Sequence, residues 1–216
     1  MFHRQLDIIP LDRLQKAKVT VIGCGAVGSF TAFTLAKMGI GHLTVWDDDQ
    51  VTEHNLPNQM FRERDIGRTK VSALSQIIED FHGVQIETHP IRYEGHVPLS
   101  GIVIVAVDSM DARLAIWEHV RYNTAIELFI DSRMGAEVGR VLTVRATDPD
   151  DITAYENTLH TSQEALQARC TEKAIIYTVL GIASAICGTV KRHLTHQAHP
   201  RDLVLDFAQN LLVAQR

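Results

Sequence analysis

Three glycines and an acid early in the chain have the types and spacing of a nucleotide-binding site. The glycines lie within the run Gly23-Cys24-Gly25-Ala26-Val27-Gly28, and Asp47 follows the last of them by about twenty residues. In such a site the first glycine makes a tight turn, the second lets the backbone approach a phosphate, and the third lets a helix pack closely on a strand. The acid accepts hydrogen bonds from a ribose. These residues favour a nucleotide but leave NAD and ATP both open, and a structural turn with a solvated loop acid is the alternative.

The elements expected around these residues have the order that the chemistry needs. Residues 19–22 form a short apolar run rich in β-branched side chains, which predicts a buried strand. Residues 26–38 predict a helix that Gly39 ends. The N-terminus of that helix would offer free N–H groups and a partial positive charge to an anion. Residues 43–46 predict the second strand, which places Asp47 at its carboxyl end.

The segment that begins at Asp47 resembles the ThiF/MoeB/HesA family, whose members are relatives of ubiquitin-activating enzymes. The family pattern is D-x-D-x-V, then N-L-x-R-Q, then G-x-x-K. The chain matches it in three runs: Asp47-Asp48-Asp49-Gln50-Val51, Asn55-Leu56-Pro57-Asn58-Gln59 and Gly67-Arg68-Thr69-Lys70. This series is far more specific than the glycines. The resemblance covers the first two thirds of the chain well and the C-terminal part more loosely.

The resemblance implies an enzyme that binds Mg-ATP and adenylates a carboxylate. In the family, the C-terminal carboxylate of a ubiquitin-like protein, a sulfur-carrier protein or a peptide attacks the α-phosphate, which gives an acyl-adenylate and pyrophosphate. The implied nucleotide-binding residues beyond the glycines are Asp47, Asp49, Asn55, Gln59 and Lys70. Lys70 and the two amides would supply the donors that a triphosphate needs, and Lys70 would be catalytic. Charge neutralisation and in-line positioning are expected to carry most of the catalysis.

Asp108 matches the family's magnesium-binding acid, so the resemblance implies that it is a metal ligand and a catalytic residue. It follows residues 102–107, an apolar run that predicts a buried strand. Ligands gather at the carboxyl ends of strands in open α/β sheets, where Asp108 would lie. The next charged residues, Asp111 and Arg113, are predicted to cap and solvate the helix that follows.

The pair Arg4-Gln5, ahead of the first strand, resembles an Arg-Gln pair of the family. In the family this arginine reaches the phosphates of the partner subunit. The resemblance therefore implies that Arg4 is catalytic in trans and that the enzyme is a homodimer. A flexible N-terminal arginine is the alternative.

The chain departs from the family pattern at Asn58, where the family has an arginine before the glutamine. A side chain that would face the phosphates has lost its charge. Arg62, Arg64 and Arg68 are the candidates to replace it. An attenuated or degenerate site is the other interpretation.

The chain has three cysteines, Cys24, Cys170 and Cys187, and no Cys-x-x-Cys pair. Many family members hold a structural zinc on two such pairs, so no zinc is expected here. The low, odd count fits a reducing cytosol. Cys24 and Cys187 are interpreted as packing residues. Cys170 resembles the reactive cysteine of the family's thiazole-synthesis branch, which implies a covalent transfer step, and an unreactive cysteine at a helix start is the alternative.

Composition limits the class of protein. With 216 residues, 45% of them hydrophobic, the chain fits one α/β domain with a sizeable core. The net charge of −5 argues against general nucleic-acid binding, which usually shows a basic excess. The first residues lack the order of a signal peptide, and no apolar run is long enough to cross a bilayer. A cytoplasmic protein is expected.

The order of the elements predicts a Rossmann-like, doubly wound α/β fold in a single domain, residues 1–216, with a mainly parallel sheet and an antiparallel C-terminal extension. The expected parallel strands are 18–23, 42–46, 84–89 and 101–107, and the expected helices between them are 26–38, 68–82 and 111–124. The antiparallel extension comprises 128–131 and 139–145, followed by an apolar helix, 171–192, and an edge strand, 203–207. Residues 1–17 are expected to form an N-terminal arm, and 147–170 a mobile crossover loop that receives the tail of a carrier protein.

Two other classes of function compete with adenylation. An NAD-dependent oxidoreductase would use the same glycines and Asp47, but it would leave the two amides, Lys70 and Asp108 without a common explanation. A non-catalytic ThiF-like binding subunit is motivated by Asn58.

Overall fold

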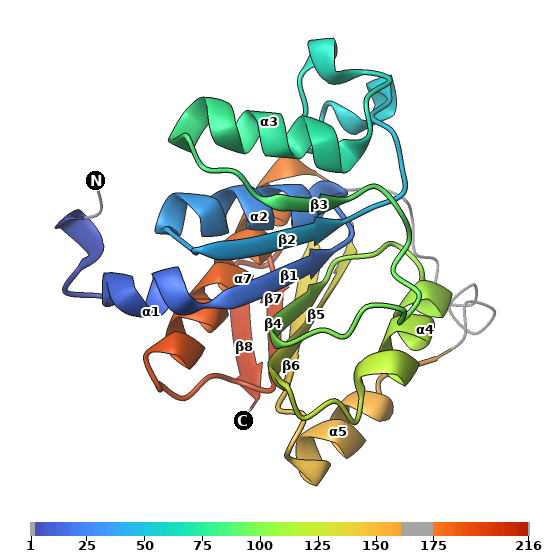
Figure 1. Ribbon diagram of the computed structural model, residues 1–216. Coiled ribbons are helices and arrows are strands. Elements are labelled where there is room, and N and C mark those ends of the chain that lie inside the picture. Colours follow the sequence, from blue (N-terminus) through green and yellow to red (C-terminus); the bar gives the residue numbers. More distant parts are fainter. Residues whose placement is uncertain (1–2, 161–174, 216) are drawn as a thin grey trace.

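A mixed sheet spans the molecule (Figure 1). The computed structural model describes residues 3–160 and 175–215 of the chain. In this part of the chain the strand order is β3-β2-β1-β4-β5-β6-β7-β8. The parallel strands are β1 Lys18–Ile22, β2 His42–Trp46, β3 Glu87–His89, β4 Gly101–Val105 and β5 Ile126–Gly135. The antiparallel strands are β6 Val138–Val144, β7 Asp202–Asp206 and β8 Leu211–Gln215. The expected doubly wound, mainly parallel sheet with an antiparallel C-terminal extension is confirmed.

Helices cover both faces of the sheet (Figure 1). On one face lie α2 Ala26–Met38, α3 Lys70–His82 and α7 Ile176–Leu194, and on the other lie α4 Met110–Val120 and α5 Pro149–Glu156. Because successive side chains of a strand point to opposite faces, each central strand contributes to two cores. In β4, Ile102 and Ile104 pack in the core under α2, α3 and α7, whereas Val103 and Val105 pack in the core under α4.

Helix α2, which follows the glycine turn, packs on the sheet with α3 and α7 as its helical neighbours. It ends at Gly39, whose φ of 98° is the left-handed conformation in which helices commonly end on glycine. The Cys187 thiol of α7 lies 3.9 Å from the carbonyl oxygen of Thr31 in α2. Arg13, in the short helix α1 Leu11–Lys16, donates to the carbonyl oxygen of Leu194 at 2.6 Å. The position of the turn therefore depends on a helix from the other end of the chain.

The structure corrects several expected elements. Part of the expected crossover loop is helix α5, which has Asp148 as its N-cap and Pro149 as its first residue. Strand β7 is not an edge strand, because β8 pairs along its outer side. The N-terminal arm contains α1 and the short 3₁₀ turn η1 His3–Gln5. The expected strand 84–89 is shorter and begins at Glu87.

The last expected helix, 171–192, is described from Ile176 and continues to Leu194 as α7. Residues 161–174, and with them the remainder of the expected crossover loop, lie outside the described residues. Among the described residues, no helix combines the length and the apolarity needed to cross a membrane.

Candidate nucleotide site

The three glycines of the turn lie in three different surroundings. Gly23 has a φ of 93°, and a Cβ there would lie 2.7 Å from the carbonyl oxygen of Ala106. A Cβ on Gly28 would lie 1.8 Å from the carbonyl oxygen of Gly23, so only glycine lets α2 approach the turn this closely. A Cβ on Gly25 would meet nothing within 4 Å. Gly25 therefore borders open space at the N-terminus of α2, where a phosphate would approach the backbone.

Asp47, at the carboxyl end of β2, is tied to this turn by backbone donors. Its Oδ2 accepts the Cys24 N–H at 2.6 Å, and its Oδ1 accepts the Asp49 N–H at 2.9 Å. The side chain is 8% exposed. Burial raises the pKa of Asp47, and nearby Lys70 and the two N–H donors oppose that rise. The carboxylate that the sequence predicts as a ribose acceptor is thus held in place before a ligand arrives.

Lys70 is the first residue of α3 and lies against the two acids of the D-x-D motif. The residue is buried, with 7% of its surface exposed. Its Nζ donates to Asp49 Oδ2 at 2.6 Å and lies 4.0 Å from Asp47 Oδ1. The structure therefore brings together Asp47, Asp49 and Lys70, which are 23 residues apart in sequence at most.

The N-L-x-x-Q segment lies against α2 and contains amide oxygens without partners. The Met60 N–H donates to Ser29 Oγ at 3.1 Å, which fixes the segment on the first turns of α2. Asn55 Oδ1 accepts from the backbone and the hydroxyl of Thr52, so its carbonyl serves a local cap. Among the described residues, the buried Asn58 Oδ1 and Gln59 Oε1 have no hydrogen-bond partner.

Buried polar groups are normally paired, and unpaired ones mark a place for a ligand or a water molecule. The two unpaired amide oxygens precede Met60, which is bonded to the first turn of α2, and as acceptors they call for a donor such as a water molecule, not for a phosphate oxygen. The open space beside Gly25 lies at the same helix start. The donors there are backbone N–H groups, carboxamides and one ammonium, which is the donor set that a nucleotide's phosphates need. The residues present therefore fit ATP.

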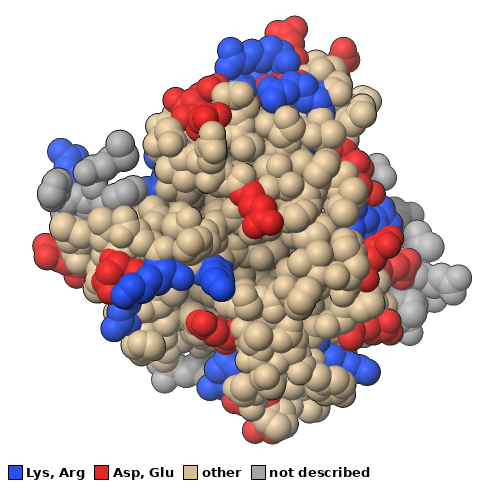
Figure 2. Space-filling view, viewed as in Figure 1, with Lys and Arg blue, Asp and Glu red and all other residues tan. Residues whose placement is uncertain are grey.

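The arginines considered as replacements at Asn58 are engaged elsewhere. Arg62 donates to Asp65 at 2.8 Å and to Asp80 at 2.7 Å. Arg64 pairs with Asp80 at 3.1 Å, and Arg68 with Asp65 at 3.2 Å. Figure 2 shows basic and acidic side chains intermixed at the top of the molecule, over the loop that leads into α3. These arginines organise that loop instead of replacing the missing charge.

Asp108 lies in the loop after β4, at the same edge of the sheet as the glycine turn. Strands β1 and β4 are neighbours, and Gly23 abuts the carbonyl of Ala106, two residues before Asp108. The Asp108 side chain is exposed. No hydrogen bond or ion pair involves it within residues 3–160 and 175–215. An exposed carboxylate without a protein partner has the hard oxygen ligands that Mg²⁺ prefers.

Two expected site residues are not brought to this site. Arg4 is exposed in η1, and its neighbour Gln5 donates to the carbonyl oxygen of Met38 at 2.6 Å, at the far end of α2. At about 1.5 Å per residue the 13-residue helix is about 20 Å long, so Arg4 lies far from its own glycine turn. Cys170 lies outside the described residues.

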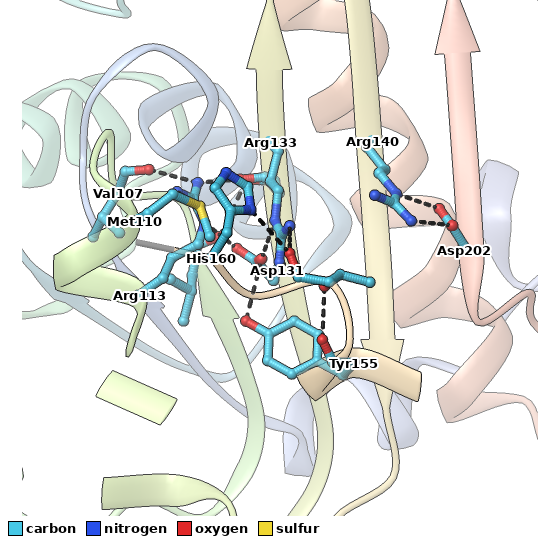
Figure 3. A network of polar contacts seen from close by, with 12 residues as sticks. Val107, Met110, Arg113, Asp131, Arg133, Arg140, Tyr155, His160 and Asp202 are labelled. Atoms are coloured by element: carbon cyan, nitrogen blue, oxygen red, sulfur yellow. Dashed lines mark hydrogen bonds and ion pairs between the residues drawn. The ribbon is translucent and has the colours of Figure 1, made fainter. Parts of the chain in front are cut away.

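A polar cluster around the buried Asp131 was not expected from the sequence (Figure 3). Arg113 is 5% exposed and does not solvate α4 as predicted; its Nε donates to the fully buried Asp131 at 2.6 Å. Arg133 and Tyr155 bind the same carboxylate. The sequence contains one signal of this cluster, which is that Asp131 directly follows the apolar run 128–130. An acid that is buried there must be paired.

Relatives of known sequence cover about half of the chain. The model of the ThiF family matches residues 3–210. Ubiquitin-like modifier-activating enzyme 5 of Drosophila ananassae is 32% identical over 123 residues, which cover 49% of this chain and 31% of that protein. Adenylyltransferase and sulfurtransferase MOCS3 of Anopheles gambiae is 33% identical over 108 residues, which cover 47% of this chain and 24% of that protein. The chain thus spans less than a third of the length of these curated relatives.

Solved structures share the fold over nearly the whole chain. The E. coli MccB structure with ATP has a TM-score of 0.77 at 16% identity and covers 95% of this chain and 65% of that one. The PaaA structure has a TM-score of 0.76 at 20% identity and covers 95% of this chain and 74% of that one. At these identities the likeness shows the fold alone.

Proposed function

Because the chain belongs to the ThiF family, we propose that it adenylates the C-terminal carboxylate of a ubiquitin-like protein, a sulfur-carrier protein or a peptide at the expense of ATP. The observation that carries this proposal is the convergence of Asp47, Lys70 and the open backbone at Gly25 at one edge of the sheet. Relatives named as activating enzymes and adenylyltransferases support the same chemistry.

Each residue of the site has a role in the proposed reaction. Asp47 accepts hydrogen bonds from the ribose, and the N–H groups at the start of α2 bind a phosphate. Lys70, already held against Asp49 at 2.6 Å, neutralises phosphate charge. Asn55 and Gln59 donate their amide N–H groups to phosphate oxygens.

Asp108 is the proposed ligand of Mg²⁺, which when bound would neutralise charge on the triphosphate. The acceptor carboxylate oxygen bonds to the α-phosphorus, and the bond from that phosphorus to the bridging oxygen of the β-phosphate breaks. Pyrophosphate leaves with the electron pair, and an acyl-adenylate remains. Two anions must approach each other, so cations and oriented donors determine the rate.

The proposed enzyme is a homodimer in which Arg4 serves the partner's site. Gln5 is pinned to the far end of α2, about 20 Å from the glycine turn of the same chain, which supports an action in trans. Mixing Arg4→Ala with Lys70→Ala protein should then restore part of the activity through hybrid dimers. Hybrid dimers that form but remain inactive would remove Arg4 from the mechanism.

A transfer step through Cys170 is the finer part of the proposal. Its thiolate would attack the carbonyl of the acyl-adenylate, a thioester would form, and AMP would leave with the electron pair of the broken C–O bond. Cys170→Ser should spare adenylation and abolish a thioester to the carrier in non-reducing gels. A covalent adduct that persists in this variant would exclude Cys170 as the nucleophile.

The test of the proposed function begins with calorimetry of the pure protein against Mg-ATP and NAD. We expect selective binding of Mg-ATP, and Lys70→Ala should weaken it by about tenfold or more, because a charge-assisted contact is lost. Lys16→Ala is the matched control, because that side chain is 82% exposed and its ion pair is with the nearby Asp12, 3.8 Å away. Selective NAD binding would instead favour an oxidoreductase.

Pyrophosphate exchange with a carrier protein that ends in glycine completes the test. Lys70→Ala or Asp108→Ala should lower exchange by about 10²- to 10³-fold. The second candidate function, a non-catalytic binding subunit, is favoured by Asn58 and by the engagement of Arg62, Arg64 and Arg68 elsewhere. It predicts ATP binding without exchange.

A further inference from the structure

We propose that Arg113 and Asp131 are positioning residues that fix the loop carrying Asp108 at the nucleotide site. This inference rests on the proposed function, because it assigns the Arg113–Asp131 pair a task in orienting the proposed magnesium ligand. Neither residue touches the nucleotide site directly, and both act through the backbone on either side of Asp108.

The Arg113 guanidinium spans the loop around Asp108. Its Nη2 donates to the carbonyl oxygen of Val107 at 2.7 Å, and its Nη1 lies 3.4 Å from the carbonyl oxygen of Ser109. These are the residues immediately before and after Asp108. The same Nη2 also donates to the carbonyl oxygen of Ser132 in β5 at 2.6 Å. One planar, five-donor group thus joins the loop to the neighbouring strand.

Asp131 prevents the guanidinium from moving. It is fully buried in β5, where it stands opposite Val105, the last residue of β4. Arg113 Nε donates to its Oδ1 at 2.6 Å. Figure 3 shows Arg113 and Arg133 converging on this carboxylate, with the Tyr155 hydroxyl on a third side. Because each member is packed and bonded, the fork of Arg113 has one orientation.

The second arginine of the cluster, Arg133, bonds the segment that follows α5. Arg133 Nε donates to Asp131 Oδ2 at 2.8 Å, and its terminal nitrogens donate to the carbonyl and hydroxyl oxygens of Thr158 at 2.8 and 2.9 Å. The Tyr155 hydroxyl donates to the same Oδ2 at 3.2 Å. Burial raises the pKa of Tyr155, so the phenol stays a donor. Asp131 therefore links the Asp108 loop to residues 155–158.

Stability alone does not account for this cluster. A buried ion pair is often no more stabilising than apolar side chains of the same volume. The first turn of α4 already has a cap, because Ser109 Oγ accepts the Ala112 N–H at 3.2 Å. Asp108, by contrast, has no partner of its own among the described residues, so the backbone that Arg113 holds is what fixes the position from which its side chain reaches out.

The test measures how strongly Mg²⁺ assists ATP binding. Calorimetry with ATP is performed with Mg²⁺ and with a chelator, and the ratio of the two affinities is the magnesium coupling. Arg113→Lys keeps the charge beside Asp131 but loses the fork. It should lower the coupling by about 10- to 100-fold, the cost of losing a residue that orients a metal ligand. ATP affinity in the chelator should stay unchanged.

The double variant with Asp108→Ala separates positioning from a general structural role. Asp108→Ala alone should abolish the coupling, and adding Arg113→Lys should then change nothing further. Arg140→Gln is the matched control, because Arg140 lies opposite Arg133 in β6 and pairs with Asp202, away from the loop. It should keep the coupling of the wild type.

Two outcomes would overturn the inference. In the first, folded Arg113→Lys retains the wild-type coupling. In the second, it loses ATP affinity equally with and without Mg²⁺. If Arg113→Lys does not fold, Tyr155→Phe, which keeps both arginines and removes one donor to Asp131, is measured instead, and a smaller loss of coupling is expected. A wild type without magnesium coupling would instead refute the proposed role of Asp108, on which the inference depends.

Discussion

Two buried carboxylates lie near the carboxyl ends of the parallel strands, and the chain holds them in different ways. Asp47 accepts two backbone N–H groups of the turn and of its own loop, and Lys70 lies 4.0 Å away. Asp131 accepts two guanidinium groups and a phenol, which come from α4, β5 and α5. One acid is held by local backbone, and the other by side chains from three elements.

This difference is consistent with the proposed role of Asp47 as a ligand-binding acid and with a structural role for Asp131. A carboxylate has about four acceptor sites, and the two N–H donors leave Asp47 with sites for a ribose. Asp131 is surrounded by protein donors and has no exposed surface. Burial raises the pKa of Asp47, whereas the Asp131 carboxylate is paired with the buried guanidinium of Arg113 and the partly buried guanidinium of Arg133. The variants below test that contrast.

The largest expected effect is on stability at Asp131. Asp131→Asn leaves two guanidinium groups without their counter-charge and should lower the free energy of unfolding by about 3–5 kcal/mol. Urea unfolding measures it. Asp202→Asn is the control, because its pair with Arg140 is partly exposed and should contribute about 1 kcal/mol or less. Equal losses in the two variants would mean that the burial of Asp131 adds nothing.

The next effect is on ligand affinity at Asp47. Asp47→Asn should weaken ATP binding by about tenfold or more, because hydrogen bonds to a charged acceptor contribute about 1.5–3 kcal/mol. Its free energy of unfolding should fall far less than that of Asp131→Asn. Calorimetry and urea unfolding on the same preparations measure both quantities. A variant that loses stability and keeps ATP affinity would reverse the roles assigned to the two acids.

A smaller effect is the pH dependence of stability contributed by Asp47. Because the folded pKa of Asp47 is raised above its ordinary value of 3.8, the folded state binds the proton more tightly than the unfolded state does. The contribution to stability is therefore favourable below the raised pKa and is lost as the pH rises from 3.8 through that value. The free energy of unfolding is measured for the wild type and for Asp47→Asn from about pH 3 to pH 7. The value for the wild type minus the value for the variant should fall as the pH rises. A difference that rises with pH would contradict the raised pKa.

The smallest effect is expected at Cys24. Cys24→Ala keeps the backbone N–H that Asp47 accepts, so ATP affinity should not change. Burial raises the pKa of the Cys24 thiol, which therefore stays protonated and takes no part in binding. Calorimetry checks the affinity. A marked loss of ATP affinity would show that the Cys24 thiol itself helps to position Asp47.

Local patterns in the sequence predicted the elements around the candidate nucleotide site well. The glycines, Asp47 and the alternation of apolar strands and helices are encoded within short stretches, and β1, α2 and β2 lie within a residue of their expected bounds. Helix α5 was missed although Asp148 and Pro149 are a normal helix start, because the residues after them are polar. Strand β8 was missed because its side chains are exposed and lack alternation.

The tertiary cluster could not be predicted for a different reason. Arg113 and Asp131 are 18 residues apart, and which carboxylate an arginine meets is decided by how α4 packs on β5. An arginine in the first turns of a helix is usually solvated, but Arg113 is buried. Similarly, the pairing of Arg62 and Arg64 with Asp80 depends on how the loop folds back on α3.

The packing of α7 on α2 has a consequence for folding during synthesis on the ribosome. Cys187 contacts Thr31 across 156 positions of sequence, and Leu194 receives Arg13 across 181. Helix α2, whose N-terminus is the proposed phosphate site, therefore keeps an apolar flank uncovered until α7, Ile176–Leu194, has been synthesised. Such long-range contacts slow folding and expose apolar surface meanwhile. Nascent chains that stop short of α7 should accordingly be clients of chaperones and lack a functional nucleotide site.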